Sequence, residues 1–167
     1  AYVLDVDGNR LVDLTSAFSV AGIGHSHPRV QAAIAEQATR LIHGMGDVYP
    51  PRVKIELSEK LAHVVPGDLE MSILCTSGAS AVEAALKTAN MATKRQAVIA
   101  FSSSYHGLHY GALNVTGYRR EFKEPFRSQT GHFAVHMPYA YCYRCALGLA
   151  YPTCRLACLT LLKNTLD

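Results

Sequence analysis

The fold is decided by residues 71–107, which read MSILCTSGASAVEAALKTANMATKRQAVIAFSSSYHG. Short apolar runs at 71–75 and 97–101 predict two β-strands, and small and apolar residues at helical spacing predict a helix over 79–92. A further strand is predicted at 132–136. Because strands and a helix alternate at this spacing, the pattern is typical of a parallel α/β sheet with helices on its faces.

The sequence before this stretch predicts a hairpin and two helices. Residues 2–6 and 10–14 flank the turn residues Asp7-Gly8-Asn9, as the two strands of a β-hairpin do. A Gly-rich loop then leads into apolar residues at helical spacing over 28–43, and a second such stripe starts near Pro51 and stops before Pro66. The residues expected at the start of the first helix are Ser26 or His27 as its cap and Pro28 in its first turn.

Composition narrows the class of protein. The chain has 167 residues, 49% hydrophobic and 17% charged, which favours a globular fold over disorder. Its formal net charge of +3, without a run of basic residues, argues against nucleic acid as a partner. No stretch approaches the roughly 20 apolar residues of a membrane-spanning helix, and the start reads as no export signal, so we expect a cytoplasmic protein. The missing initiator Met suggests a piece of a longer chain.

Four of the five cysteines fall late in the chain, with the spacing C-x2-C-x8-C-x3-C. An odd number of cysteines without an export signal predicts reduced thiols. Four thiolates could surround a zinc ion, although the eight-residue interval is short for such a site and no metal is expected. Alternatively, the last two pack on a closing helix while the first two lie in a loop. The four late cysteines are Cys142, Cys145, Cys154 and Cys158. The closing helix is expected to carry leucines 156, 159, 162 and 166.

The break between the first predicted strand and its helix has the residues of an anion site. Gly78 permits a close approach to the backbone, the N–H groups of the first helical turn are free, and the hydroxyls of Thr76, Ser77 and Ser80 can add hydrogen bonds. Neither G-x-G-x-x-G nor G-x-x-x-x-G-K-[ST] occurs, which favours a small monophosphate over a dinucleotide or nucleoside triphosphate. The alternative interpretation is an ordinary helix cap.

A second polar loop, 102–107, follows the next predicted strand. In an open α/β sheet, ligands bind beyond the carboxyl ends of the strands, so this loop should lie beside the first. The ring of Tyr105 could stack on a planar ligand, and His106 could hydrogen-bond to it. The alternative is a tyrosine packed under a turn that Gly107 closes.

Three motifs, in this order, resemble the class III aminotransferases, a subgroup of the fold-type I pyridoxal-phosphate enzymes that includes the ω-amino acid and 4-aminobutyrate transaminases. The motifs are Gly24-His25-Ser26-His27-Pro28, S-G-A-S-A-V-E-A-A-L-K at 77–87, and Phe101 through Tyr105-His106-Gly107. The resemblance runs from Tyr2 to at least Tyr139. It implies an N-terminal portion of such an enzyme, with an N-terminal segment at 1–65 and part of the cofactor-binding large domain, with an incomplete sheet, at 66–167.

The resemblance also implies a site. Ser77, Gly78 and Ala79 would form the phosphate cup of pyridoxal 5'-phosphate, Tyr105 would stack on its pyridine ring, and His106 would lie beside it. The family further implies a homodimer with active sites at the subunit interface, an amine or amino acid as donor, and a 2-oxo acid as acceptor. The 22–28 loop of such enzymes commonly lies near the substrate entrance.

Two positions depart from the family pattern. Many members have an acidic residue where this chain has Ser80, a change expected to keep the cup but to alter its hydrogen bonds. Members that clamp a substrate α-carboxylate often have Arg where this chain has Leu108. Leucine cannot make a bidentate pair with a carboxylate, which disfavours the ornithine-type and acetylornithine-type subgroup.

The chain offers no catalytic residue. Pyridoxal chemistry needs a lysine that forms a Schiff base and a carboxylate that keeps the pyridine nitrogen protonated. None of the six lysines occupies the family's Schiff-base motif, so this chain alone should be inactive. They are Lys54, Lys60, Lys87, Lys94, Lys123 and Lys163.

Other functions remain open from the sequence alone. A non-catalytic phosphate-binding module, a zinc module built on the four late cysteines, and an aminomutase of the same fold family each agree with part of the pattern. For a portion of an enzyme, the high apolar fraction also predicts an exposed apolar surface.

Overall fold

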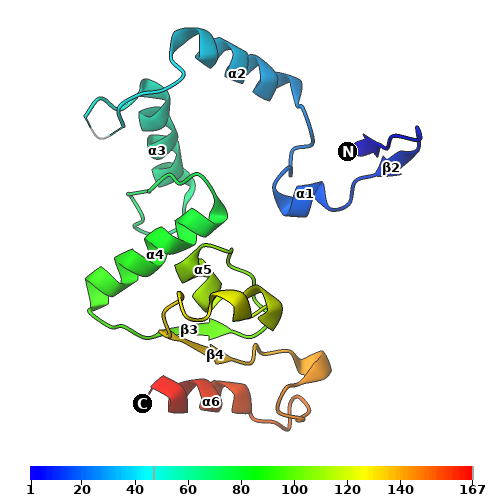
Figure 1. The fold of residues 1–167 in the computed structure, drawn as a ribbon, viewed down its shortest axis with the longest axis vertical. Helices are drawn as coiled ribbons and strands as arrows, with labels where there is room; N and C mark the ends of the chain where they lie inside the picture. The colour runs from blue at the N-terminus through cyan, green and yellow to red at the C-terminus, as the bar shows by residue number, and fades with distance from the viewer. Residues whose placement is uncertain (47, 167) are drawn as a thin grey trace. The chain divides into compact units, whose positions relative to one another are not determined.

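The computed structural model describes residues 1–46 and 48–166 (Figure 1). The chain divides into two compact units, 1–72 and 73–167, each with its own internal contacts. The domain boundary expected between residues 65 and 66 stays a prediction, and Asp167, the last residue of the expected second domain, lies outside the described residues.

The first unit begins with the predicted hairpin. Strands β1 (Tyr2–Leu4) and β2 (Arg10–Val12) pair antiparallel, with Tyr2 opposite Val12. Asp5 shapes the turn because one of its carboxylate oxygens accepts the N–H groups of Asp7 at 3.0 Å and Asn9 at 2.9 Å. Gly8 occupies the left-handed region with φ +83°, which glycine adopts without steric cost. The hairpin is confirmed, with strands shorter than expected.

Asp13 organises the chain after the hairpin. Its carboxylate accepts the N–H of Ser16 at 2.8 Å, and its other oxygen lies 2.8 Å from Nε2 of His25. These bonds hold a short turn, α1 (Ser16–Ser19), to the Gly-rich loop before the next helix. The hydrogen bond with His25 and those from the backbone lower the pKa of Asp13 from 3.8 to about 2. One carboxylate therefore ties together two segments that the sequence presents only as loop.

Two amphipathic helices follow in the first unit, α2 (Pro28–Arg40) and α3 (Arg52–Val64). The predicted cap is confirmed at His27, whose Nδ1 accepts the N–H of Arg29 at 3.3 Å, and Pro28 lies in the first turn. The helix ends three residues before the expected residue 43. No residue of either helix is buried, so their apolar stripes lie open in this chain.

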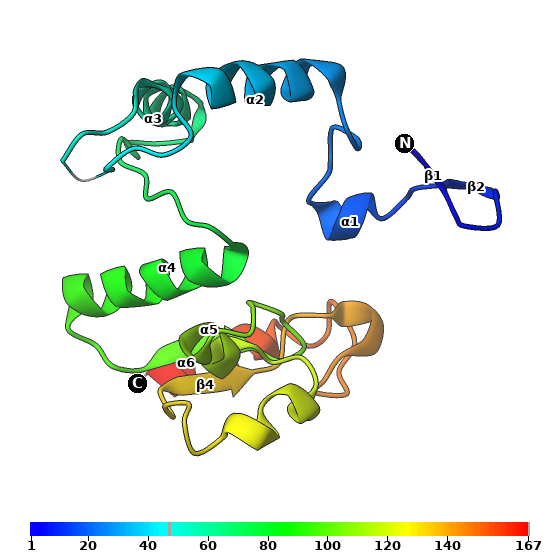
Figure 2. The ribbon, with the colours of Figure 1, turned by 45° about the horizontal axis from the view of Figure 1, so that its top comes forward.

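The second unit holds the predicted helix and the two later predicted strands (Figure 2). Helix α4 (Gly78–Thr93) leads to β3 (Val98–Phe101), which pairs in parallel with β4 (Ala134–Met137). A short helix, α5 (Tyr110–Val115), packs on α4 and on both strands. The remaining elements are the 3-10 turns η1 (Arg120–Phe122), η2 (Glu124–Phe126) and η3 (Cys142–Arg144), and helix α6 (Ala157–Leu166).

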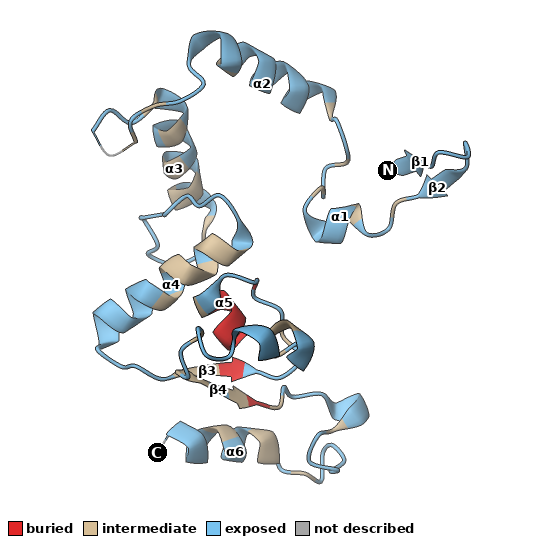
Figure 3. Cartoon of the chain, in the orientation of Figure 1, coloured by how far each residue is buried: buried red, intermediate tan, exposed pale blue. Residues whose placement is uncertain are grey.

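The core of the second unit is small and lies where α5 meets the two strands (Figure 3). Its buried apolar residues are Ala100, Ala112, Leu113, Val115 and Met137. Leu113 is only 1% exposed, whereas large apolar side chains elsewhere lie open, for example Val6 and Met71. The expected exposed apolar surface is confirmed.

One local prediction was wrong, and one helix was not predicted. Residues 71–75 form no strand, because a strand needs a neighbour for its backbone N–H and C=O groups and β3 and β4 pair with each other among the described residues. Helix α5, in a segment that reads only as small residues, was not expected, because six residues are too few to display a helical period.

Within the described part of the chain, no helix is both long and apolar enough to cross a membrane.

The Asp13 contacts predict a response to acid. The lowered pKa means that the carboxylate stabilises the folded loop fully above its ordinary pKa of 3.8, and that this contribution is lost as the pH falls towards about 2. Carboxyl NMR should show Asp13 titrating with a midpoint near 2. His25→Ala removes the largest cause and should move that midpoint upward; an unmoved midpoint would contradict this account of the loop.

Candidate cofactor-phosphate site at the start of helix α4

The N-terminus of α4 is closed by two serines. Ser77 is the N-cap, with extended backbone dihedrals of φ −157° and ψ 164°, and its Oγ accepts the N–H of Ser80 at 3.1 Å. In return, Oγ of Ser80 accepts the N–H of Ser77 at 2.9 Å. This reciprocal pair is a capping box in which serine takes the place that glutamate usually holds. The expectation that Ser80 alters the local hydrogen bonds agrees with this geometry.

The cap leaves donors available for a ligand. The first N–H groups of a helix have no partner within the helix, and here the cap satisfies Ser80 but not Gly78 or Ala79. Ser80 donates its hydroxyl hydrogen to the Ser77 carbonyl at 2.8 Å, and Oγ of Ser77 lies 3.1 Å from Oγ of Ser80, so the Ser77 hydroxyl can turn its hydrogen either to Ser80 or to a ligand. No described heavy atom lies within 4 Å of a side chain built on Gly78, so the backbone there is open to approach.

Gly107 brings the second predicted loop to the same helix end. A Cβ atom built on Gly107 would lie 2.5 Å from Cβ of Ala79, and φ of Gly107 is +116°, a value suited to glycine. The loops that the sequence placed side by side, 76–80 and 102–107, therefore meet through this backbone contact. Ser77, Gly78, Ala79 and the neighbours of Gly107 lie around one helix end.

Buried Thr116 holds the second loop in shape. Its Oγ1 accepts the N–H of His106 at 3.0 Å and lies 3.0 Å from the carbonyl oxygen of Gly107 and 2.9 Å from that of Ala112. The hydroxyl has one hydrogen, so it donates to one of these carbonyls at a time. Thr116 is fully buried, which makes these bonds the fixed support for the backbone on either side of His106.

Tyr105 and His106 themselves remain exposed. The Tyr105 ring is 58% exposed and meets the ring of Tyr118 edge to face, with centroids 6.5 Å apart. Tyr118 donates its backbone N–H to the carbonyl of Ser104 at 2.9 Å, which keeps the two rings together. A planar group could thus stack on Tyr105 from the open side.

A small phosphate ester fits these residues. Two free backbone N–H groups and one hydroxyl converge on the positive end of a 16-residue helix, whose dipole contributes about 0.3–1 kcal/mol towards an anion. Most of the attraction must therefore come from the hydrogen bonds. The exposed Tyr105 ring lies on the loop that contacts this helix end through Gly107. A compound with both a phosphate and a ring needs two binding groups placed in this way.

Three supporting residues were missed by the sequence reasoning. Besides Thr116, Oε1 of Glu83 accepts the N–H of Ala112 at 2.9 Å, and Oδ1 of Asn114 accepts the N–H of Ala134 at 3.0 Å. Glu83 and Asn114 thereby fasten α5 to α4 and to β4. The one available signal was Glu83 itself, a lone carboxylate among the small and apolar residues 79–86.

A second polar cluster lies at the C-terminal end of α5. Nζ of Lys123 donates to the carbonyl of Asn114 at 3.1 Å and lies 3.2 Å from Nε2 of His136. Burial lowers the pKa of Lys123; burial, followed by the charge of Lys123, lowers the pKa of His136. Lys123, which the sequence places in a polar loop, is thus half-buried and braces the C-terminal end of α5.

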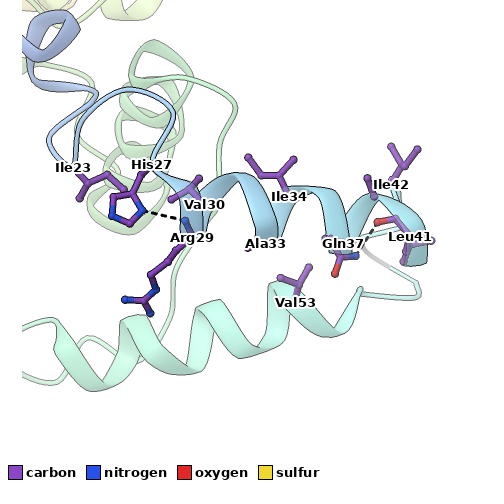
Figure 4. Close-up of a pocket in the computed structure, with 11 residues that line it drawn as sticks. Ile23, His27, Arg29, Val30, Ala33, Ile34, Gln37, Leu41, Ile42 and Val53 are labelled. Carbon is purple, nitrogen blue, oxygen red and sulfur yellow. Dashed lines mark hydrogen bonds between the residues drawn. The ribbon is translucent and has the colours of Figure 1, made fainter. Parts of the chain in front are cut away.

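The first unit carries a separate apolar groove of about 810 Å³ (Figure 4). It runs along α2, where Val30 and Ile34 line it, and Val53 of α3 closes one part. His27 and Arg29 lie at one end, but the hydrogen bond drawn between them belongs to the helix cap. The groove contains none of the predicted site residues.

The contact between Gly107 and Ala79 predicts a strong effect of a single methyl group. Gly107→Ala must relieve both the overlap and the positive φ, and should lower the free energy of unfolding of the second unit by about 2–5 kcal/mol. Gly148→Ala is the matched control, because Gly148 has φ +66° with no described atom within 4 Å of the added methyl, and should cost about 1 kcal/mol. Urea unfolding followed by circular dichroism measures both; equal losses would contradict the contact.

Comparison with known proteins identifies the family of this chain. The model of the family "Aminotransferase class-III" matches residues 1–151. A probable 4-aminobutyrate aminotransferase of Bacillus subtilis is 37% identical over 154 residues, which cover 90% of this chain and 34% of that protein. An isoleucine 2-epimerase of Lentilactobacillus buchneri is 37% identical over 145 residues, covering 86% of this chain and 32% of that protein.

A solved structure extends the likeness to the fold. The taurine:2-oxoglutarate aminotransferase of Bifidobacterium kashiwanohense, solved in complex with PLP and glutamate, superposes with a TM-score of 0.81 and 27% identity. The superposition covers 99% of this chain and 37% of that one. The chain spans about a third of the length of the curated relatives that it matches. The chain belongs to the class III aminotransferase family.

Proposed function

We propose that this chain is the part of a pyridoxal-phosphate-dependent aminotransferase that holds the phosphate and one ring face of the cofactor. The observation that carries the proposal is the contact of Gly107 with Ala79, which joins the free N–H groups of the α4 cap to the Tyr105 loop. Family membership supports the choice of cofactor. We propose two domains, an N-terminal segment at 1–65 and a cofactor-binding part at 66–167.

Each proposed site residue has one task. The N–H groups of Gly78 and Ala79 and the hydroxyl of Ser77 donate to phosphate oxygens, while Ser80 keeps Ser77 oriented through the cap. When bound, pyridoxal phosphate supplies an electron sink for bonds broken at the substrate's α-carbon. Tyr105 excludes water from one face of the ring.

His106 completes the proposed site from beside the ring. Its backbone N–H is fixed on Thr116, so the side chain starts from a rigid position and can donate or accept at a ring substituent. Thr116 is therefore a positioning residue and contacts no cofactor atom in this proposal.

We propose that the groups that make and break bonds lie in the part of the longer relatives that this chain does not match. Lys87, on α4, is nine residues after Gly78, which places it about 14 Å along the helix axis from the phosphate end. Lys123 is engaged with Asn114 behind α5. We assign the covalent lysine and the carboxylate facing the pyridine nitrogen to sequence that the longer relatives carry. In that whole enzyme we propose a cytoplasmic homodimer, an amine or amino acid as donor, and a 2-oxo acid as acceptor.

A second candidate is an isomerase of the same family, such as an epimerase or aminomutase. The observation that favours it is the relative named as an isoleucine 2-epimerase. The two candidates differ in one requirement: a transaminase consumes a 2-oxo acid in each cycle, whereas an isomerase turns over a single substrate without one.

The phosphate cup predicts a specific loss of affinity. Pyridoxine 5'-phosphate, which has no aldehyde to react with lysines, should shift the amide resonances of Gly78 and Ala79 far more than pyridoxine. Gly78→Pro removes the backbone N–H of residue 78, and proline is compatible both with the first helical position and with the extended backbone of Ser77 before it. This variant should bind pyridoxine 5'-phosphate about tenfold to a hundredfold more weakly.

The matched control is Gly78→Ala, which keeps the N–H and meets no described atom. It should bind within about twofold of the parent chain, because an N–H rather than a side chain is the ligand. Equal affinities of the proline and alanine variants would refute the cup.

The assignment of the lysine predicts an inactive chain. Incubated with pyridoxal phosphate, an amino donor and a 2-oxo acid, the full chain should form no amino acid product, while a complete class III aminotransferase does so in the same assay. Turnover by this chain alone would show that one of its own lysines performs the chemistry and would overturn the assignment.

A further inference from the structure

Four cysteines surround one small cavity in the second unit. The cavity has a volume of about 30 Å³ and lies between the turn at 141–149 and the start of α6. Cys142 is exposed, and the other three are half-buried. The lining consists of Tyr141, Cys142, Cys145, Leu147, Leu149, Tyr151, Cys154, Leu156, Ala157 and Cys158. Neither the proposed cofactor site nor its supports use any of these thiols.

The backbone after Cys145 makes a tight turn. Gly148 takes the left-handed conformation, with φ +66°, and donates its N–H to the carbonyl of Cys145 at 3.0 Å. The backbone N–H groups of this turn, that of Leu149 first and that of Leu147 next, lower the pKa of the Cys145 thiol. A thiol held in this way has more of the reactive thiolate at neutral pH than an ordinary one.

Cys142 lies one turn before Cys145. The segment between them is the 3-10 turn η3, in which Arg144 donates its N–H to the carbonyl of Tyr141 at 3.1 Å. A turn of this kind brings the Cα atoms of residues three apart within about 7 Å, close to the range that a disulfide spans. The pair is also the only C-x-x-C sequence in the chain.

Thiol chemistry fits this cluster better than metal binding. In residues 1–46 and 48–166, no three histidine, cysteine or carboxylate side chains are placed so that they could hold a metal ion. The cysteines share a cavity wall without converging on one point, and the backbone N–H groups that follow Cys145 lower the pKa of its thiol.

We propose that Cys145 and Cys142 form a thiol–disulfide exchange site whose substrate is a low-molecular-weight disulfide. The thiolate of Cys145 attacks one sulfur of the disulfide RSSR, forms a mixed disulfide, and expels RS⁻. The thiol of Cys142 then attacks the Cys145 sulfur, forms the Cys142–Cys145 disulfide, expels the second RS⁻, and gives up its proton to it. Two protein thiols are oxidised and one RSSR is reduced to two RSH.

Oxidised glutathione added to the full chain tests the proposal. Timed samples are alkylated and mapped by mass spectrometry without reduction. Cys145 should react at least about threefold faster than Cys75, the cysteine outside the cluster, although Cys75 is the more exposed of the two. The product should be a Cys142–Cys145 disulfide with two glutathiones released per chain. Cys145 should also keep its reactivity to lower pH than Cys75 does.

Variants separate the two steps. Cys142→Ser, or Cys142→Ala should the serine variant not fold, must stop at glutathione attached to Cys145, with one glutathione released. Cys75→Ser is the control and should leave rate and product at Cys145 unchanged. The proposal is overturned if Cys145 reacts no faster than Cys75, if the disulfide joins Cys145 to Cys154 or Cys158, or if a bound zinc ion protects all four thiols.

Discussion

The close approach of Gly107 to Ala79 is the contact on which the second unit depends. It fixes how the loop after β3 meets the start of α4, and it is possible only because residue 107 has no side chain. Two hydrogen bonds support the segments on either side of it, from the His106 N–H to Thr116 and from the Ala112 N–H to Glu83. With five buried apolar residues among those that the structure describes, such a unit relies on specific backbone contacts more than a large domain does.

The sequence predicted the regular parts of this arrangement because their signals are local. Helix α4 was expected over 79–92 and runs from Gly78 to Thr93, and the parallel strands β3 and β4 lie within one or two residues of their expected positions. The strand expected at 71–75 is absent. An apolar run indicates only that a segment is able to pair as a strand, whereas the pairing itself depends on a neighbouring strand elsewhere in the chain.

The candidate site was predictable to a similar degree. The sequence named the helix end at Ser77–Ala79 and the Tyr105 loop, because glycine, serine and a following helix have recognisable chemistry. It could not name Thr116 or Glu83 as supports, since a threonine or glutamate becomes one only when a long-range fold buries it against a particular backbone N–H. The two loops were expected to meet at the carboxyl ends of parallel strands, and they do meet although 71–75 forms no strand, through a contact of Gly107 with Ala79 that the sequence did not indicate.

The cap of α4 determines how the helix end responds to charge. No acidic side chain lies in the first turn, and the residue that closes the capping box, Ser80, is neutral. A carboxylate at that position would repel an incoming anion and would titrate in mildly acidic solution. With serine there, the positive potential of the helix end is undiminished, and protonation of the first turn cannot alter it. A shift in anion affinity with pH at this end would then come from outside the first turn, either from the anion itself or from the neighbouring 102–107 loop.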